Sequence, residues 1–133
     1  MQKVEHIGIA VKNLDNAIPL FEKLLNSLCY KTELVETEKV NTAFLKQGET
    51  KIELLESTDP EGVIARFIEK KGEGLHHIAF EVDNIEQEME RLKNEGFVLL
   101  NEKPKPGADN KLICFLHPKN TNGVLIELCQ SIN

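Results

Sequence analysis

Two histidine–glutamate pairs occur at corresponding positions of this chain, and together they offer the donor atoms of a metal site. His6 lies in the segment HIGIAV and Glu53 in IELLE, while His77 lies in HIAFEV and Glu127 in IELCQ. Two imidazoles and two carboxylates form a mixed nitrogen and oxygen ligand set that suits Zn²⁺, Ni²⁺, Co²⁺, Mn²⁺ or Fe²⁺. The sequence therefore predicts a single divalent metal ion, with water or substrate in its remaining positions.

The four candidate ligands are expected on strand faces that point away from an apolar core. In HIGIAV the aliphatic residues alternate with His6 and with small residues, and in IELLE the carboxylate of Glu53 stands between two aliphatic neighbours. The second copy repeats both patterns around His77 and Glu127. Because successive side chains of a strand point to opposite faces, the aliphatic set should be packed and the ligands should face elsewhere.

An internal repeat accounts for this recurrence. Residues 6–14 (HIGIAVKNL) align with residues 77–85 (HIAFEVDNI), and after a short insertion in the second copy IELLE (52–56) aligns with IELCQ (126–130). Such similarity along the chain indicates a duplication. Two copies packed about a pseudo-twofold axis would bring the four candidate ligands together.

The repeat predicts an α+β fold made of two tandem βαβββ modules. We expect one domain over residues 1–133, with module one at 1–57, a connecting helix within 58–73 and module two at 74–133. Apolar residues at helical spacing predict helices from Leu14 to Leu25 and from Ile85 to Asn94, and Asp59-Pro60 predicts the start of the connecting helix. The remaining strands are expected at 30–37, 40–47, 50–56, 97–102, 111–117 and 123–129, with a loop at 104–107.

Composition restricts the classes of function and the location. The chain has 133 residues and a net charge of −6, which argues against a nucleic-acid surface. We expect no membrane association, because no apolar stretch approaches the roughly 18–20 residues of a membrane span and the amino terminus lacks a signal-peptide layout. Cys29, Cys114 and Cys129 are unclustered and lie in apolar surroundings, so we expect free thiols and a cytoplasmic location.

These features resemble the vicinal oxygen chelate, or glyoxalase-fold, superfamily. Within it, the strings at 6–11, 52–56, 72–85 (GEGLHHIAFEVDNI) and 103–130 (KPKPGADNKLICFLHPKNTNGVLIELCQ) are similar to the methylmalonyl-CoA epimerase family. The resemblance covers essentially the whole chain. It implies a curved eight-stranded sheet that forms a cradle around the metal site, built from modules that pair within one chain or swap between two.

The resemblance also implies an activity, which is epimerisation of (R)- and (S)-methylmalonyl-CoA by proton abstraction through a metal-stabilised enolate. Glu127 is expected to be the first base and Glu53 the second carboxylate. Some epimerases have Gln at the Glu53 position, and some family members have a Glu, assigned as a second base, near the position of Asn41. The implied metal ligands, to one Co, Zn, Ni or Mn ion, are His6, Glu53, His77 and Glu127.

An acyl-CoA substrate needs a local positive patch for its phosphates. Lys111 and Lys119 are the candidates, beside His117, with ordinary solvated lysines as the alternative. We also expect a homodimer from the resemblance. His76, which adjoins a ligand but should point to the other strand face, is expected to be a partly buried structural histidine rather than a substrate contact.

Two other functions remain open at this point. Bacterial glyoxalase I (lactoylglutathione lyase) uses the same ligand types, but glutathione carries two carboxylates best held by guanidinium groups, and this chain has only Arg66 and Arg91. Its HPKNTNG turn also differs from the DPDG-like turn usual in glyoxalases. The second alternative is a non-catalytic member of the superfamily that binds a ligand, which the complete set of four metal ligands disfavours.

Overall fold

A computed structural model describes residues 1–132 of the chain, and in them the βαβββ order occurs twice. The first copy consists of β1 (Lys3–Ala10), α1 (Leu14–Leu25), β2 (Lys31–Val35), β3 (Val40–Gln47) and β4 (Thr50–Ser57). The helix α2 (Val63–Lys71) follows. The second copy consists of β5 (Gly74–Glu81), α3 (Ile85–Asn94), β6 (Lys105–Gly107), β7 (Lys111–Leu116) and β8 (Ile126–Ser131). The predicted α+β class with two βαβββ modules is confirmed.

The chain divides into two compact units. The first unit comprises residues 6–76, and the second comprises residues 1–5 together with the chain from residue 77 onward. The connecting helix α2 therefore belongs to the first unit, and the amino-terminal residues of β1 belong to the second. Strand β1 passes from one unit to the other between Glu5 and His6.

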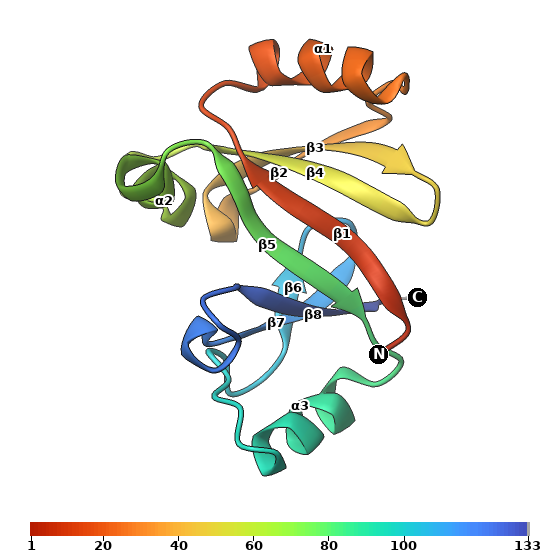
Figure 1. Ribbon diagram of the computed structural model, residues 1–133, viewed down its shortest axis with the longest axis vertical. Coiled ribbons are helices and arrows are strands. Elements are labelled where there is room, and N and C mark those ends of the chain that lie inside the picture. Colours follow the sequence, from red (N-terminus) through yellow and green to blue (C-terminus); the bar gives the residue numbers. More distant parts are fainter. Residues whose placement is uncertain (133) are drawn as a thin grey trace. The chain divides into compact units, whose positions relative to one another are not determined.

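In the first unit the strands have the order β2-β3-β4-β1, and α1 covers one face of them (Figure 1). β1 runs parallel to β4, and the other neighbours are antiparallel. The face toward α1 carries the apolar half of each alternating strand, as the sequence predicts. The buried residues of this core are Val11, Leu14, Ala17, Ala43, Leu45 and Leu54.

The second unit repeats this arrangement with the order β5-β8-β7-β6, and α3 covers one face (Figure 1). β5 runs parallel to β8, and β7 is antiparallel to both β8 and β6. The core under α3 contains Val82, Ile85, Met89, Leu92, Cys114, Leu116 and Leu128. On the opposite face of the sheet, Phe115 packs against a smaller cluster made of Ala79, Ile113 and Cys129.

The repeat extends to individual hydrogen bonds. Asn13 caps α1 by accepting a hydrogen bond from the backbone N–H of Asn16, and Asn84 caps α3 in the same way through the N–H of Gln87, each at 3.1 Å. Asparagine is among the residues that helix N-termini favour, because its side-chain oxygen satisfies a backbone donor that has no partner within the helix. Equivalent residues thus start both helices.

The prediction of a strand at 97–102 is wrong, because the strand at this edge of the sheet lies later in the chain. Residues in this segment do lie along β7, because Leu99 forms an isolated bridge with Leu116 and the N–H of Leu100 donates to the carbonyl of Phe115. The continuous edge strand is instead β6, which falls in the predicted loop at 104–107. Pro106 is tolerated there because a proline can occupy an edge strand, where its missing N–H is not required.

The connecting helix also begins later than predicted. The carboxylate of Asp59 accepts a hydrogen bond from the N–H of Glu61, which closes a turn of the kind that Asp favours, and the helix starts at Val63 after Gly62. Its predicted end is confirmed, since α2 stops at Lys71 before Gly72, whose φ is +79°.

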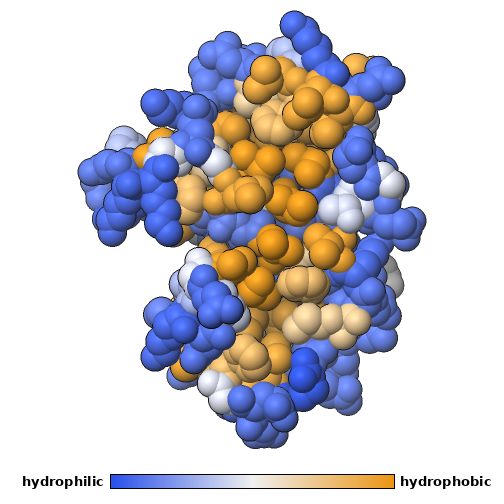
Figure 2. Space-filling view, in the orientation of Figure 1, coloured by the Kyte–Doolittle hydropathy of each residue, from blue (hydrophilic) through white to orange (hydrophobic). Residues whose placement is uncertain are grey.

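The outer surface of α1 exposes apolar side chains. Leu20 and Leu24 are 61% and 71% exposed, Leu28 beyond the helix is 76% exposed, and orange atoms reach the surface around α1 in Figure 2. Among residues 1–132 no helix has the length and apolar character that crossing a membrane requires.

The matched caps give a test of the duplicated architecture. Replacing Asn13 or Asn84 by Ala should each lower the free energy of unfolding by about 1 kcal/mol, because each change leaves a helix donor without its partner. Urea denaturation of the two variants measures this. Asn94→Ala, at the exposed end of α3, is the control and should change stability by less than about 0.5 kcal/mol. A loss in only one of the two caps would contradict their equivalence.

Candidate metal centre

His6 and Glu53 form a buried pair in the first unit. The parallel register of β1 and β4 sets Gly8 opposite Glu53, so that Glu53 and His6 lie near each other on the face that α1 does not cover. His6 Nε2 lies 3.3 Å from Glu53 Oε1, and the two side chains are only 8% and 6% exposed. Gly8 leaves space beside the imidazole because it has no side chain.

His77 and Glu127 form the equivalent pair in the second unit. Ala79 of β5 stands opposite Glu127 of β8, in the place that Gly8 occupies opposite Glu53. His77 Nε2 lies 3.2 Å from Glu127 Oε1, with side-chain exposures of 4% and 6%. The ring of Phe115 meets the imidazole edge to face, with 5.8 Å between centroids and an interplanar angle of 88°, which fixes the orientation of the imidazole.

The geometry of both pairs fits joint ligation of a metal. Two ligands about 2.1 Å from a tetrahedral Zn²⁺ lie roughly 3.4 Å from each other, and the observed nitrogen–oxygen separations are 3.3 and 3.2 Å. Each pair therefore presents its donor atoms at a separation that is compatible with ligation of one cation. The predicted association of His6 with Glu53 and of His77 with Glu127 is present in the structure.

Asn41 lies on the opposite face of its sheet from Glu53. The register pairs Glu53 with Phe44, so the even-numbered residues of β3 share the face of the carboxylate. Asn41 instead lies on the same face of β3 as Ala43 and Leu45, which belong to the core beneath α1. Its side chain is therefore placed away from the candidate ligands.

The two lysines considered for the phosphates have different environments. Lys111 Nζ lies 3.8 Å from Glu5 Oε2 and donates a hydrogen bond to Ser131 Oγ at 2.8 Å, and its side chain is only 10% exposed. Lys119 is exposed in the short 3₁₀ turn after β7. Burial and an acidic partner disfavour Lys111 as a contact for an external phosphate, and Lys119 is the lysine that remains available.

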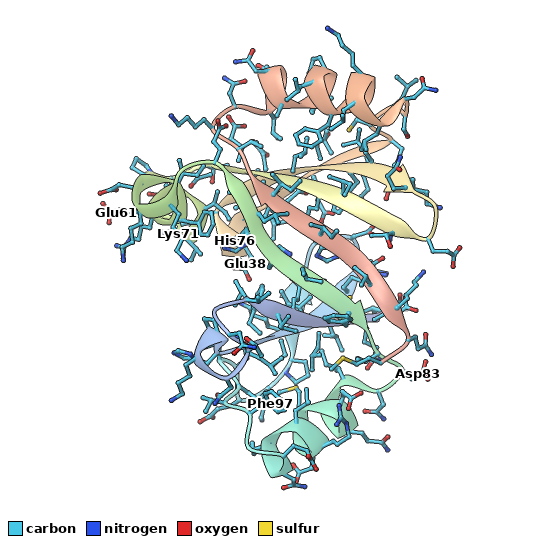
Figure 3. The ribbon with its side chains drawn as sticks, viewed as in Figure 1. Glu38, Glu61, Lys71, His76, Asp83 and Phe97 are labelled. Carbon is cyan, nitrogen blue, oxygen red and sulfur yellow. The ribbon has the colours of Figure 1, made fainter. Side chains whose placement is uncertain are left out.

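The other two histidines have structural contacts. His117 Nδ1 accepts a hydrogen bond from the N–H of Lys119 and so caps the turn at Pro118–Asn120. His76 meets the ring of Phe67 edge to face, with 4.9 Å between centroids, and lies beside α2 in Figure 3. Burial, followed by the positive charge of Lys71, lowers the pKa of His76 to about 4. These contacts match the structural role expected for His76.

A buried charged residue that the sequence did not single out is Glu5. It is 2% exposed and forms an ion pair with Lys111. A carboxylate oxygen of Glu5 also lies within 4.8 Å of the Cys129 sulfur. The three cysteines are free thiols; Cys114 and Cys129 are buried, and burial raises the pKa of both.

Comparison with known proteins identifies the family. The model of the glyoxalase/bleomycin resistance protein/dioxygenase superfamily matches residues 5–115. The chain belongs to this superfamily, which confirms the predicted glyoxalase-like fold.

Individual relatives show which members of the superfamily the chain resembles. An uncharacterized protein of Bacillus subtilis is 40% identical over 130 residues, which cover 98% of this chain and 93% of that protein. The ethylmalonyl-CoA/methylmalonyl-CoA epimerase of Cereibacter sphaeroides is 38% identical over 130 residues, covering 96% and 97%. A solved methylmalonyl-CoA epimerase variant of Streptomyces coelicolor, in complex with 2-nitronate-propionyl-CoA, is 32% identical, with a TM-score of 0.94 and coverage of 98% and 95%. The predicted resemblance to methylmalonyl-CoA epimerases, which are isomerases, is confirmed.

Because the two His–Glu pairs are equivalent, we predict that His6 and His77 contribute equally to metal affinity. His6→Ala and His77→Ala should each weaken the binding of Co²⁺ by more than about 100-fold, since losing even an indirect partner of a ligand typically costs 10–100-fold. Calorimetric titration of the purified variants measures this. His117→Asn keeps a capping side chain in its turn and serves as the control, with unchanged affinity. Native affinity in either alanine variant would remove that histidine from the ligand set.

Proposed function

We propose that this chain is a metal-dependent epimerase of methylmalonyl-CoA. The observation that carries the proposal is the presence of two equivalent buried His–Glu pairs with metal-ligand spacing, in a chain similar to named epimerases. In the proposal all four residues hold one divalent ion, either Co, Zn, Ni or Mn. The internal repeat supports this sharing, because each copy supplies one histidine and one glutamate at equivalent positions.

The reaction requires removal of a proton from the carbon between a thioester and a carboxylate, and return of a proton to the opposite side. When bound, the ion would supply Lewis acidity that stabilises the negative charge developing at the thioester oxygen. Glu127 is proposed as the first base and Glu53 as the second. A carboxylate has two oxygens, so one can be a ligand while the other accepts the proton.

The symmetry of the two pairs suits an inversion. A planar intermediate must be approached from both sides, and the duplication supplies one carboxylate in each unit. Asn41 does not take part in this scheme, because it lies on the core side of β3. The second base is therefore assigned to Glu53 and not to a residue at position 41.

Glyoxalase I activity is the competing function, and the arginines argue against it. Arg66 on α2 forms an ion pair with Glu61 at 2.8 Å, and Arg91 on α3 forms one with Glu88. α3 covers the face of its sheet that is opposite to His77 and Glu127. Arg91 is thus placed on the helix side of its sheet, away from His77 and Glu127, and Arg66 is engaged by a carboxylate. A ligand-binding protein without catalysis would not require an open metal site with all four ligands, His6, Glu53, His77 and Glu127.

The proposal also includes an oligomeric state and a cellular location. The exposed leucines of α1 and of the segment after it offer apolar surface that a second copy would cover, which supports a homodimer and is tested by light scattering. The proposed location is the cytoplasm, where the free thiols of the chain would stay reduced.

The role of Glu127 can be tested by proton exchange. Glu127→Gln should lower turnover of methylmalonyl-CoA by about 10²–10⁴-fold while retaining much of the metal affinity, because the amide cannot accept the proton. The measurement is deuterium incorporation from solvent at the substrate α-carbon, run beside an assay on the methylglyoxal–glutathione hemithioacetal. Glu86→Gln on the exposed face of α3 is the matched control and should leave turnover unchanged.

Two results would contradict this assignment. Near-native deuterium incorporation in Glu127→Gln would show that another group removes the proton. Faster turnover of the hemithioacetal than of methylmalonyl-CoA by the native chain would replace the epimerase by a glyoxalase.

Lys119 is proposed to contact the phosphates of CoA. Lys119→Ala should raise KM for the CoA substrate with little change in kcat, which is the signature of lost uniform binding. The effect should diminish with added salt, since exposed charges are screened over about 10 Å at 0.1 M. Steady-state kinetics at two ionic strengths measure both effects, and Lys23→Ala at the exposed end of α1 is the control. An unchanged KM at low salt would exclude Lys119 from the substrate site.

A further inference from the structure

We propose that the buried ion pair between Glu5 and Lys111 positions the metal ligand His6, so that Lys111 is a positioning residue and not a phosphate contact. The inference rests on the proposed metal site. It concerns two charged side chains that the proposed reaction does not otherwise use.

Both members of the pair are removed from solvent. The side chain of Glu5 is 3% exposed and that of Lys111 is 10% exposed, with 3.8 Å between Oε2 and Nζ. Lys111 Nζ also donates to Ser131 Oγ at 2.8 Å, so its position is set from two sides. Burying two charges is expensive, and apolar residues of similar size often give equal or greater stability, so stability alone is a poor explanation of this pair.

The pair connects β1 to the sheet that carries Glu127. Lys111 is the first residue of β7 and stands opposite Ser131 of β8, the same strand that holds Glu127. Glu5 is thereby tied to the end of the β7–β8 pair at which β7 begins and β8 ends. A second bond, from the N–H of Gln2 to the carbonyl of Glu81, attaches the start of β1 to β5.

His6 is the next residue after Glu5, at the point where β1 leaves the second unit. Consecutive Cα atoms are separated by a fixed distance of about 3.8 Å, so restraining Glu5 restrains the backbone of His6. The hydrogen bond to Ser131 Oγ fixes Lys111 Nζ, and the charge on Nζ attracts the Glu5 carboxylate at 3.8 Å. The pair therefore restrains the point of the backbone at which the first ligand, His6, begins.

The test replaces the pair by uncharged side chains of similar size. The double variant Glu5→Gln/Lys111→Met should fold with a melting temperature near the native value, because no lone charge remains buried. Its affinity for Co²⁺ should fall by about 10–100-fold, the range seen when the support of a ligand is lost. With methylmalonyl-CoA, kcat should fall while KM stays near its native value, since Lys111 does not contact the substrate.

Glu61→Gln/Arg66→Met is the matched control. It removes one negative and one positive charge from an exposed ion pair on α2 and its preceding turn, and Co²⁺ affinity should stay native. Ser131→Ala removes only the hydrogen bond to Nζ and should give a smaller weakening of Co²⁺ binding, which keeps the proposal testable if the double variant does not fold.

The outcomes separate this inference from the proposed function. Native Co²⁺ affinity in the double variant, or in Ser131→Ala if the double variant does not fold, would overturn the positioning role while leaving the metal site intact. A rise in KM with unchanged kcat would instead make Lys111 a substrate contact and also overturn the inference. Absence of Co²⁺ binding by the native chain would overturn the proposed metal site, and the positioning role with it.

Discussion

The parallel pairing of the first and last strand in each repeat is the constraint on which the candidate centre depends. In both copies this pairing sets a small residue opposite a glutamate, with a histidine two positions before the small residue. The resulting nitrogen–oxygen distances differ by only 0.1 Å between the units, being 3.3 and 3.2 Å. A shift of either pairing by one residue would turn the carboxylate toward the helix side and destroy the pair.

Burial of the two glutamates costs solvation free energy that the surrounding groups must offset. A carboxylate removed from water must be compensated by hydrogen bonds or opposite charge, because an isolated buried charge is strongly unfavourable. In each unit the imidazole supplies a nearby polar partner, and in the proposal a divalent ion supplies the charge. In each four-stranded group one helix, α1 or α3, covers the face opposite the His–Glu pair, so the core does not use the face that carries the pair. The duplication then gives two carboxylates, which suits a reaction that moves protons on both sides of one carbon.

The alternation of side chains and the internal repeat were sufficient to predict both His–Glu pairs, the α+β class and most elements from the sequence. The errors have local causes. Pro106 led to the prediction of a loop where the edge strand β6 lies. The turn formed by Asp59 places the start of α2 later in the chain than the sequence predicts. Lys111 looked like a surface lysine because sequence patterns do not show which charges are paired. Its partner Glu5 is distant in the chain, so their ion pair is visible only in the structure.

The number of metal ions bound by each chain tests the central claim most directly. If the two pairs share a single site, the protein loaded with Co²⁺ and freed of excess metal should contain one ion per chain. Native mass spectrometry together with elemental analysis of the same sample measures this ratio. Two ions per chain would show that each His–Glu pair binds its own metal and would contradict the shared centre.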